Sequence, residues 1–556
     1  MKKWVCHIIL SILVITFSSC GVSKSLHDKP ILEGYNNAIP IVNKQSNFSF
    51  SSGNNFLFKN QQNLWELYVE GDALERGLVT GALTDSLLKK QERVFFSKIN
   101  DFVPSKTKKW ALREFLKWYN RKLYLNVPEE FKTEIYGISE YTSHDFDNIA
   151  PAYLRSLYLH GAHDIGHALK DLALVGCSSF AAWGEKSADG SLILGRNFDF
   201  YAGDEFAKDK IVAFINPKDG HPFMMVTWAG MIGAVSGMNN EGITVTINAG
   251  KSKIPLIAKT PISILTREIL QYASTLDEAI TIAKKRKVFV SESIMVGSAT
   301  DKKAIIIEVS PHNFGVYDVK NNNQLICTNH FQSTELKDDD RNQYQITNSH
   351  SKYRYDRITQ LFDHYKKIDV DAAAAILRDK EGIDGAKIGY GNEKALNQLI
   401  AHHGIIFKPE QRLVWVSTNP YQLGEFVCYD LKKIFNKRNS IDTIFSLQEQ
   451  DLNIPKDLFL ETPEYENYEK FRIEDRKMDY LLKSNKGLPK DFAENYQSLN
   501  PDYWVVYYKV GLYFYRKKEY KLAEKQFEIA LTKEITTLPE KLGIEKYLKK
   551  IERKLQ

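Results

Sequence analysis

The chain has 556 residues, which is long enough for two to four domains with sizeable cores. It is 43% hydrophobic and 26% charged, an ordinary balance for a globular protein that argues against long disordered stretches. The net charge of +6 is spread thinly over the chain and forms no basic stripe. We therefore expect no nucleic-acid partner.

Residues 1–20 have the pattern of an export signal. A basic start at Lys2 and Lys3 precedes an apolar run over 8–17 that is too short to span a membrane. The following Phe17-Ser18-Ser19-Cys20 resembles the lipobox of bacterial lipoproteins, with Phe in place of the usual Leu. This resemblance implies cleavage before Cys20 and a diacylglyceryl group on its sulfur. An ordinary secretory signal is the alternative, and both place the mature protein outside the cytoplasm, in the periplasm or at the cell surface.

The five cysteines are too few for a secreted protein held together by disulfides. Cys6 would leave with the signal and Cys20 would carry the lipid. If Cys177 is a nucleophile, only Cys327 and Cys428 remain, so at most one disulfide could form.

The first part of the mature chain divides into a tether and a helical unit. Residues 21–60 are rich in Asn, Ser, Gly and Lys, which favours a flexible linker. Residues 61–176 begin with a strand and a glycine-containing helix over 64–81. Helical patterns continue over 95–124 and 129–140.

After Cys177 the pattern changes to short apolar runs separated by turns, which predicts antiparallel sheet. Strands are expected at 210–216, 222–228, 232–237, 243–248, 293–299, 303–310, 323–328, 412–418 and 425–430. Helices are expected at 261–273, 276–286, 350–365 and 370–380. Strands and helices in separate blocks indicate a layered α+β fold.

Residues 436–556 are predicted to be helical. The segment 504–531 resembles one tetratricopeptide repeat, mainly through the spacing of Ala523 and Phe527. A single repeat cannot bury its own apolar face, so we expect it to pack on the catalytic region or on neighbouring helices. A peptide-binding array is the alternative.

The chemistry is expected at Cys177, which follows Gly176 inside the chain. Cutting the bond between them would make Cys177 an N-terminal residue, whose thiol is a nucleophile and whose α-amine, with a pKa near ~8, can act as the base. A small preceding residue favours the N-to-S acyl shift that frees such an amine. Arg196 and Asp199 can return beside Cys177, where the arginine would favour the thiolate and the carboxylate would hold the amine.

These segments resemble a known family. Gly176-Cys177-Ser178-Ser179-Phe180 with Gly195-Arg196-Asn197-Phe198-Asp199-Phe200 is similar to C45-type N-terminal-nucleophile hydrolases. That group includes the acyl-CoA:6-aminopenicillanic acid acyltransferase and is related to choloylglycine hydrolases and acid-ceramidase-like amidases. Further segments resemble the family in the same order, over roughly residues 64–435: Val69–Gly81, Gly237–Gly242, Cys327–Phe331 and Ser351–Arg357.

The resemblance implies a role for each matched residue. Cys177 would be the nucleophile, with Arg196 and Asp199 orienting its thiol and amine. Asn329 would donate from its side-chain amide to the oxyanion, where one donor contributes on the order of 3 kcal/mol. Asn248 would complete that hole through its backbone. Arg354 would be the family's late arginine, with Arg357 as the competing choice.

The resemblance also implies the architecture and the reaction. The expected fold is a four-layer α-β-β-α N-terminal-nucleophile sandwich at 177–435, after a helical prosegment at 61–176 that stays attached once cut. The expected activity is hydrolysis or transfer of an acyl group held in an N-acyl amide, without a cofactor, and an acyl-coenzyme A is among the substrates that the family suggests.

Two alternatives remain open from the sequence. His160, His163 and His167 lie at spacings of three and four, which imitates a zinc-hydrolase helix with Asp164 where such motifs have Glu. Gly161 and Gly166 weaken that helix, and no clear further ligand follows. The other alternative is an uncut, non-catalytic lipoprotein that uses its repeat-like end to bind a partner.

Overall fold

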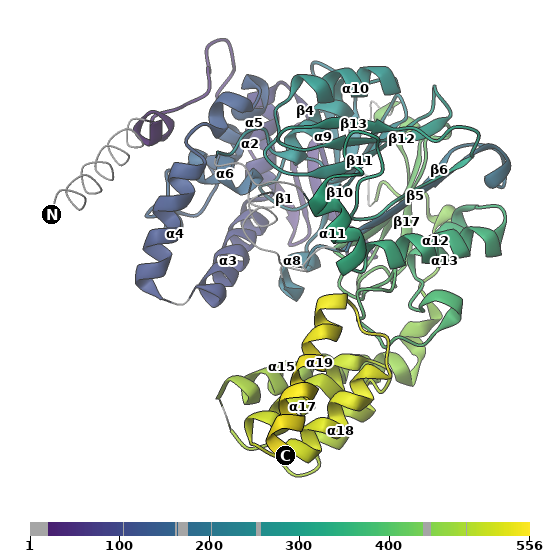
Figure 1. The fold of residues 1–556 in the computed structure, drawn as a ribbon. Helices are drawn as coiled ribbons and strands as arrows, with labels where there is room; N and C mark the ends of the chain where they lie inside the picture. Colours follow the sequence, from purple (N-terminus) through teal and green to yellow (C-terminus); the bar gives the residue numbers. More distant parts are fainter. Residues whose placement is uncertain are drawn as a thin grey trace, which may run out of the picture.

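Two β-sheets form the centre of the protein (Figure 1). The structure is a computed structural model that describes residues 21–103, 105–161, 164, 176–201, 203–251, 257–436, 446–484 and 486–556. Around the sheets it shows a mixed α+β arrangement with a helical C-terminal region.

The larger sheet has eleven strands. In spatial order they are β1 (Asn43–Ser46), β2 (Ser49–Ser52), β3 (Asn55–Lys59), β4 (Trp65–Gly71), β7 (Ile211–Pro217), β8 (Phe223–Thr227), β9 (Ser236–Asn239), β10 (Ile243–Ala249), β11 (Glu292–Ser298), β12 (Lys303–Val309) and β13 (Phe314–Tyr317). Neighbouring strands are antiparallel except β4 and β7, which pair in parallel from Trp65 opposite Ile211.

The smaller sheet has six strands, and Cys177 directly precedes one of them, β5 (Ser178–Ala182). Their order is β14 (Gln324–Cys327), β5, β6 (Ile193–Phe198), β15 (His403–Lys408), β16 (Leu413–Ser417) and β17 (Phe426–Asp430). The hairpin of β5 and β6 places Ser179 opposite Arg196.

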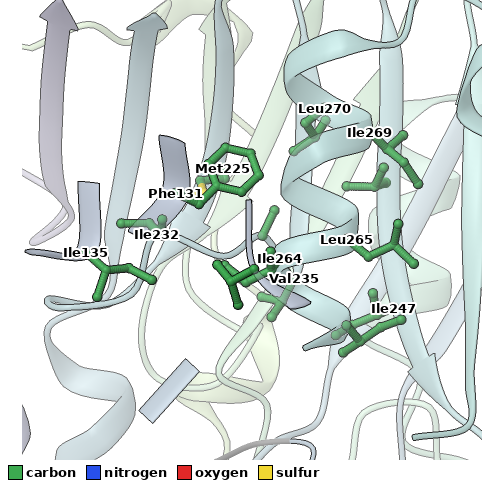
Figure 2. Close-up of a cluster of buried hydrophobic side chains, with 14 of the residues drawn as sticks. Phe131, Ile135, Met225, Ile232, Val235, Ile247, Ile264, Leu265, Ile269 and Leu270 are labelled. Atoms are coloured by element: carbon green, nitrogen blue, oxygen red, sulfur yellow. The ribbon is translucent and has the colours of Figure 1, made fainter. Parts of the chain in front are cut away.

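Three apolar layers hold these sheets and their helices together. Residues such as Phe214 of the larger sheet and Ile405 of the smaller one share the cluster between the sheets. Helices α9 (Ile262–Tyr272) and α10 (Leu276–Lys285) cover the outer face of the larger sheet, and Figure 2 shows Leu265 and Ile269 of α9 with Ile247 of β10. Helices α12 (Ser351–Tyr365) and α13 (Val370–Leu377) cover the smaller sheet. The layers therefore run helix, sheet, sheet, helix.

The linker expected over 21–60 is instead partly structured. Residues 43–59 form β1, β2 and β3, which continue the larger sheet beyond β4. Phe56, Leu57 and Phe58 are buried. Leu57 packs into the apolar cluster beneath the helices on one face of the sheet, and the rings of Phe56 and Phe58 stack on each other on the opposite face. The Asn, Ser and Gly residues that suggested a linker supply the hairpin turns.

The chain before Cys177 also contributes helices: α2 (Ala73–Leu83), α3 (Asp85–Phe102), α4 (Lys106–Tyr119), α5 (Glu129–Ser139) and α6 (Ala152–His160). Helices α2 and α5 pack so closely that a Cβ on Gly77 would lie 2.2 Å from the carbonyl oxygen of Glu134. Glycine at 77 therefore lets α2 approach α5 closely enough for Arg76 to reach Glu134.

A buried ion cluster links this N-terminal part to the rest of the protein. Arg76 of α2 and Arg267 of α9 contact the same carboxylate oxygen of Glu134, at 2.7 and 3.1 Å. Burial by itself raises the pKa of Glu134, but Arg267 and Arg76 hold that pKa below its usual value. The cluster therefore stabilises the fold at neutral pH, and its contribution is lost as the pH falls through the lowered pKa.

Replacing Glu134 with glutamine is expected to destabilise the protein by about 3 kcal/mol or more, because two buried guanidinium groups lose their shared carboxylate. Urea unfolding of the full chain at pH 7 measures this loss. Glu140→Gln, at the exposed end of the same helix, should change stability by less than about 0.5 kcal/mol. Equal stability of the two variants would contradict the assignment of the cluster.

The C-terminal helices form a unit that packs on the sheets' flank. They are α15 (Pro463–Ser484), α16 (Phe492–Ser498), α17 (Trp504–Arg516), α18 (Tyr520–Leu531) and α19 (Leu538–Leu555), and α14 (Leu431–Asn436) precedes them. Ala523 and Phe527 are fully buried in one cluster with Leu399 and Leu423, which lie before the helices in the chain. The repeat-like pair is therefore covered by its neighbours.

In the part of the chain that the structure describes, no helix combines the length and the apolarity needed to cross a membrane. Cys177, Cys327 and Cys428 are buried free thiols in this part.

Candidate active site

Cys177 lies immediately before β5, with only 1% of its surface exposed. The Nη2 atom of Arg196 lies 3.8 Å from the Cys177 sulfur, and the backbone N–H of Asp199 also donates to this sulfur. Both partners come from the return strand β6 and the residue after it, because the tight β5–β6 pairing brings Asn197 opposite Ser178. The local hairpin thus assembles the first part of the site.

Arg196 is fixed by contacts other than the thiol. Its guanidinium donates to the carbonyl oxygen of Ile247 at 2.6 Å and to the hydroxyl of Ser236, and it lies over the ring of Phe198. These contacts join β6 to the larger sheet and hold the charge at the sulfur.

The thiol of Cys177 is neutral at pH 7 in the uncut chain. Burial raises the pKa of the thiol to about 11, although Arg196 acts in the opposite direction. Arg196 thus favours the thiolate, as expected, but in the buried site the loss of hydration outweighs its effect on the pKa.

Asp199 is a buried carboxylate whose two oxygens have no hydrogen-bond partner within the described residues. Burial raises the pKa of this group to about 7, against the lowering effect of Arg354 and Arg196. The backbone N–H of the same residue donates to the Cys177 sulfur. A buried carboxylate without a donor so close to Cys177 in the chain fold is suited to receive an ammonium group.

We expect Asp199→Asn to stabilise the uncut chain, tested in a Cys177→Ala background. Because the pKa of Asp199 is raised in the folded chain, its carboxyl group loses the proton at a lower pH when the chain is unfolded. Asp199 therefore makes the folded chain progressively less stable as the pH rises from about 4 to 7. The gain from asparagine should be about 2 kcal/mol larger at pH 7 than at pH 5. Urea unfolding at the two pH values measures it, with exposed Asp338→Asn as the control. A gain that does not grow with pH would refute the assignment.

Arg354 of α12 connects the backbone of Cys177 to Asn329. Its Nη1 donates to the Cys177 carbonyl oxygen at 2.6 Å and to the Ser178 hydroxyl at 2.8 Å, and its Nη2 donates to Oδ1 of Asn329 at 2.7 Å. Burial lowers the pKa of Arg354 to about 10, and Asp199 acts in the opposite direction. Arg357 instead pairs with Asp379 and Glu381, so of the two candidates Arg354 lies at the site.

Asn329 and Asn248 lie in different surroundings. The Nδ2 atom of Asn329 donates to the carbonyl oxygen of Ala249 at 2.9 Å, which leaves one of its two amide hydrogens for another acceptor. Asn248 accepts from the Ser179 hydroxyl at 2.8 Å and donates to the Cys327 carbonyl at 3.1 Å. Its side chain therefore bridges the two sheets.

Two further polar residues adjoin the site and were not predicted. Gln398 donates from Nε2 to the carbonyl oxygen of Gly176 at 2.8 Å. Glu292 of β11 is fully buried, and neither of its carboxylate oxygens has a hydrogen-bond partner among the described residues. Burial and the nearby Asp164 raise the pKa of Glu292 well above its usual value. No sequence motif marks either residue, since each acts through its tertiary position.

His160, the first residue of the zinc alternative, is occupied by hydrogen bonds. Its Nδ1 lies 2.8 Å from the Ser156 carbonyl oxygen, and its Nε2 accepts from the backbone N–H of Ile232 at 3.0 Å. Burial lowers the pKa of this imidazole to about 4. With both nitrogens used, His160 is not free to bind a metal. His163, His167 and Cys20 lie outside the described residues, within which no group of three metal-ligating side chains occurs.

Residues 183–418 match the family described as acyl-coenzyme A:6-aminopenicillanic acid acyl-transferase. An uncharacterized protein of Archaeoglobus fulgidus is 24% identical over a 346-residue alignment that covers 56% of this chain. The protein dcd1B of Dictyostelium discoideum is 25% identical over a 301-residue alignment that covers 50% of this chain. The matched part spans 57% of the length of each of these relatives.

Two solved structures are also similar. A Caenorhabditis elegans N-acylethanolamine-hydrolyzing acid amidase ortholog is 18% identical, with a TM-score of 0.31 over 42% of this chain and 93% of its own. A conjugated bile acid hydrolase from Clostridium perfringens is 13% identical, with a TM-score of 0.31 over 46% and 93%. Residues 183–418 therefore carry the sequence pattern of the acyl-coenzyme A:6-aminopenicillanic acid acyl-transferase family, and Cys177 lies just before the matched range.

Proposed function

We propose that this chain is an amidohydrolase or acyltransferase whose nucleophile is an N-terminal Cys177, released by cutting the Gly176–Cys177 bond. The observation that carries the proposal is that three charged residues are gathered around Cys177. Arg196 lies at the sulfur of Cys177, and Arg354 donates to its carbonyl oxygen. The backbone N–H of Asp199 donates to the same sulfur, and the carboxylate of Asp199 has no hydrogen-bond partner among the described residues. The family match over residues 183–418 supports this chemistry.

In the mature protein the thiol of Cys177 attacks the carbonyl carbon of an N-acyl amide, and the α-amine accepts the thiol proton. The free hydrogen of the Asn329 amide donates to the oxyanion. The amine then gives its proton to the leaving nitrogen, which leaves a thioester on Cys177. Water completes hydrolysis, and an acceptor amine completes acyl transfer. Asp199 pairs with the α-ammonium and Arg196 with the thiolate.

An apolar cavity supports an apolar acyl group as part of the substrate. It is lined mainly by apolar side chains, including Phe95, Phe200, Phe206, Trp228 and Met231. One of its lining residues, Phe200, directly follows Asp199 in the chain. Fatty-acyl amides, and acyl-coenzyme A as an acyl donor, fit this lining better than small polar amides do.

The location and the assembled state are part of the same proposal. Cys20 carries a lipid anchor, so the enzyme is exported and membrane-attached, in the periplasm or at the cell surface. The fragment before Cys177 stays bound after the cut. Two contacts across the cut support this, the parallel pairing of β4 with β7 and the cluster of Arg76, Glu134 and Arg267.

Intact-mass analysis and N-terminal sequencing of the purified chain test the proposal. We expect two fragments on a denaturing gel, the larger beginning at Cys177, that elute together under native conditions. Screening N-acyl amides with acyl chains of increasing length by mass spectrometry should find longer chains hydrolysed faster. A chain that remains whole and does not react with thiol probes would contradict the enzyme and favour the non-catalytic binding protein.

A further inference from the structure

We propose that Gln398 is the oxyanion donor of the maturation step, and that the C-terminal helices position it for that step. This inference rests on the proposed function, because it concerns the cut at Gly176–Cys177. It assigns a role both to a residue without a motif and to the C-terminal region.

The first observation is the contact itself. Gln398 lies 222 positions from Gly176 in the chain, yet its Nε2 donates to the Gly176 carbonyl oxygen at 2.8 Å. Gln398 is 1% exposed and Gly176 is also buried. A carbonyl oxygen that already accepts from a buried amide is polarised towards attack at its carbon.

The second observation is the space that Gly176 leaves for this amide. A Cβ on residue 176 would lie 2.1 Å from Nε2 of Gln398 and 2.5 Å from its Oε1. Because the end of a glutamine side chain can move, a larger residue at 176 would displace the amide rather than break the fold. Glycine is therefore needed here for the hydrogen bond itself.

The other polar groups of the site act on other atoms. Arg354 donates to the carbonyl oxygen of Cys177, and Nδ2 of Asn329 donates to the carbonyl oxygen of Ala249. Among the side chains that the structure describes, Gln398 alone has a recorded hydrogen bond to the Gly176 oxygen. The donor for the maturation oxyanion thus differs from the donor proposed for the substrate oxyanion.

The step balances without a cofactor. The Cys177 sulfur bonds to the Gly176 carbonyl carbon, and the carbonyl oxygen becomes an oxyanion that Gln398 stabilises. The bond from that carbon to the Cys177 nitrogen then breaks, and the thiol proton ends on the departing amine. Water hydrolyses the resulting thioester, which yields a Gly176 carboxylic acid and restores the Cys177 thiol.

The C-terminal helices hold the loop that presents Gln398. Asn500 donates to the Tyr390 carbonyl at 2.8 Å and accepts from the Tyr390 N–H at 3.1 Å. Asn392 donates to the Glu534 carbonyl at 2.9 Å. Leu399, next to Gln398, is buried in the apolar cluster of these helices. The loop is thus anchored on both sides of Gln398, so the C-terminal region fixes where the amide lies.

The test uses the full chain made by cell-free synthesis, with the fragment beginning at Cys177 followed over time on denaturing gels. Gln398→Ala should slow cleavage by about 10²–10³-fold, the usual effect of losing one oxyanion donor. Gln398→Met keeps the length of the side chain without an N–H and should slow it equally. Gln343→Ala, on the exposed side of α11 (Asp340–Asn348), should cut at the wild-type rate.

Double variants separate a direct role from a structural one. Gly176→Ala should slow cleavage by displacing the amide, and it should add little in a Gln398→Ala chain. Asn500→Ala should likewise slow cleavage only when Gln398 is present, which general destabilisation would not produce.

The outcomes distinguish the two proposals. Folded Gln398→Ala and Gln398→Met chains that cut at the wild-type rate would overturn the role of Gln398 and leave the enzyme proposal standing. Effects of Gly176→Ala and Asn500→Ala that are independent of Gln398 would overturn the positioning by glycine and by the C-terminal helices. A wild-type chain that never cuts would overturn the proposed function, and this inference with it.

Discussion

Replacing Cys177 with alanine is expected to leave the chain whole and to lower amide hydrolysis by about 10⁴-fold or more. In the proposed mechanism the same sulfur is the nucleophile in maturation and in turnover, and loss of a nucleophile removes nearly all of the rate that depends on it. Intact mass measures the first effect, and product formation from a responsive N-acyl amide measures the second.

Cys428→Ala is the matched control, since Cys428 is another buried free thiol, on β17. This variant should be cut and active like the wild type. Hydrolysis by a folded Cys177→Ala chain at more than about one part in a hundred of the wild-type rate would assign the chemistry to another group.

Replacing Arg354 with methionine should lower kcat/KM of the mature protein by about 10²–10³-fold. The guanidinium holds the Cys177 carbonyl, the Ser178 hydroxyl and the Asn329 amide at once, each with a distance of 2.8 Å or less. Without it, Asn329 loses the contact that orients its amide, and an oxyanion donor that is not held in place contributes little.

Steady-state kinetics on the cut fraction, corrected by active-site titration with a thiol probe, measure this effect. Arg357→Met removes an arginine from the next turn of the same helix, where it pairs with Asp379 and makes no contact with Cys177 or Asn329 that the structure shows. It should change kcat/KM by less than about fivefold. Equal losses in the two variants would mean that α12 acts through stability alone.

The sequence alone brought Cys177, Arg196 and Asp199 together as a candidate site because they are close together in the chain, and in the structure they lie side by side. Cys177 and Arg196 belong to neighbouring strands of one hairpin, and hairpin patterns are short-range signals. Strands such as β7, β10 and β12, and helices α9 and α12, also agree with their predicted ranges within two residues. Local patterns of alternating apolar residues and turn residues were sufficient to predict the ranges of these elements.

Some strands were missed. Strands β1, β2 and β3 lie in a segment that was expected to be a linker because it is rich in polar residues, and β13 and β15 were not predicted. β15 depends on a distant partner, since it pairs with β6 as well as with its sequence neighbour β16. Such pairing brings together residues far apart in the chain, for which local composition carries little signal.

The sequence by itself therefore singled out Cys177 as the candidate nucleophile, the proposed bond to be cut and two charged neighbours, because all of these lie within one stretch of chain. Only the tertiary structure decided the rest. It shows that Arg354, and not Arg357, contacts Cys177, and that the side chain of Asn248 bridges the two sheets. It also places Gln398 against Gly176, which lies 222 positions away in the chain. It also raised the pKa of the Cys177 thiol, since burial is a property of the folded chain and outweighs the effect of a nearby charge.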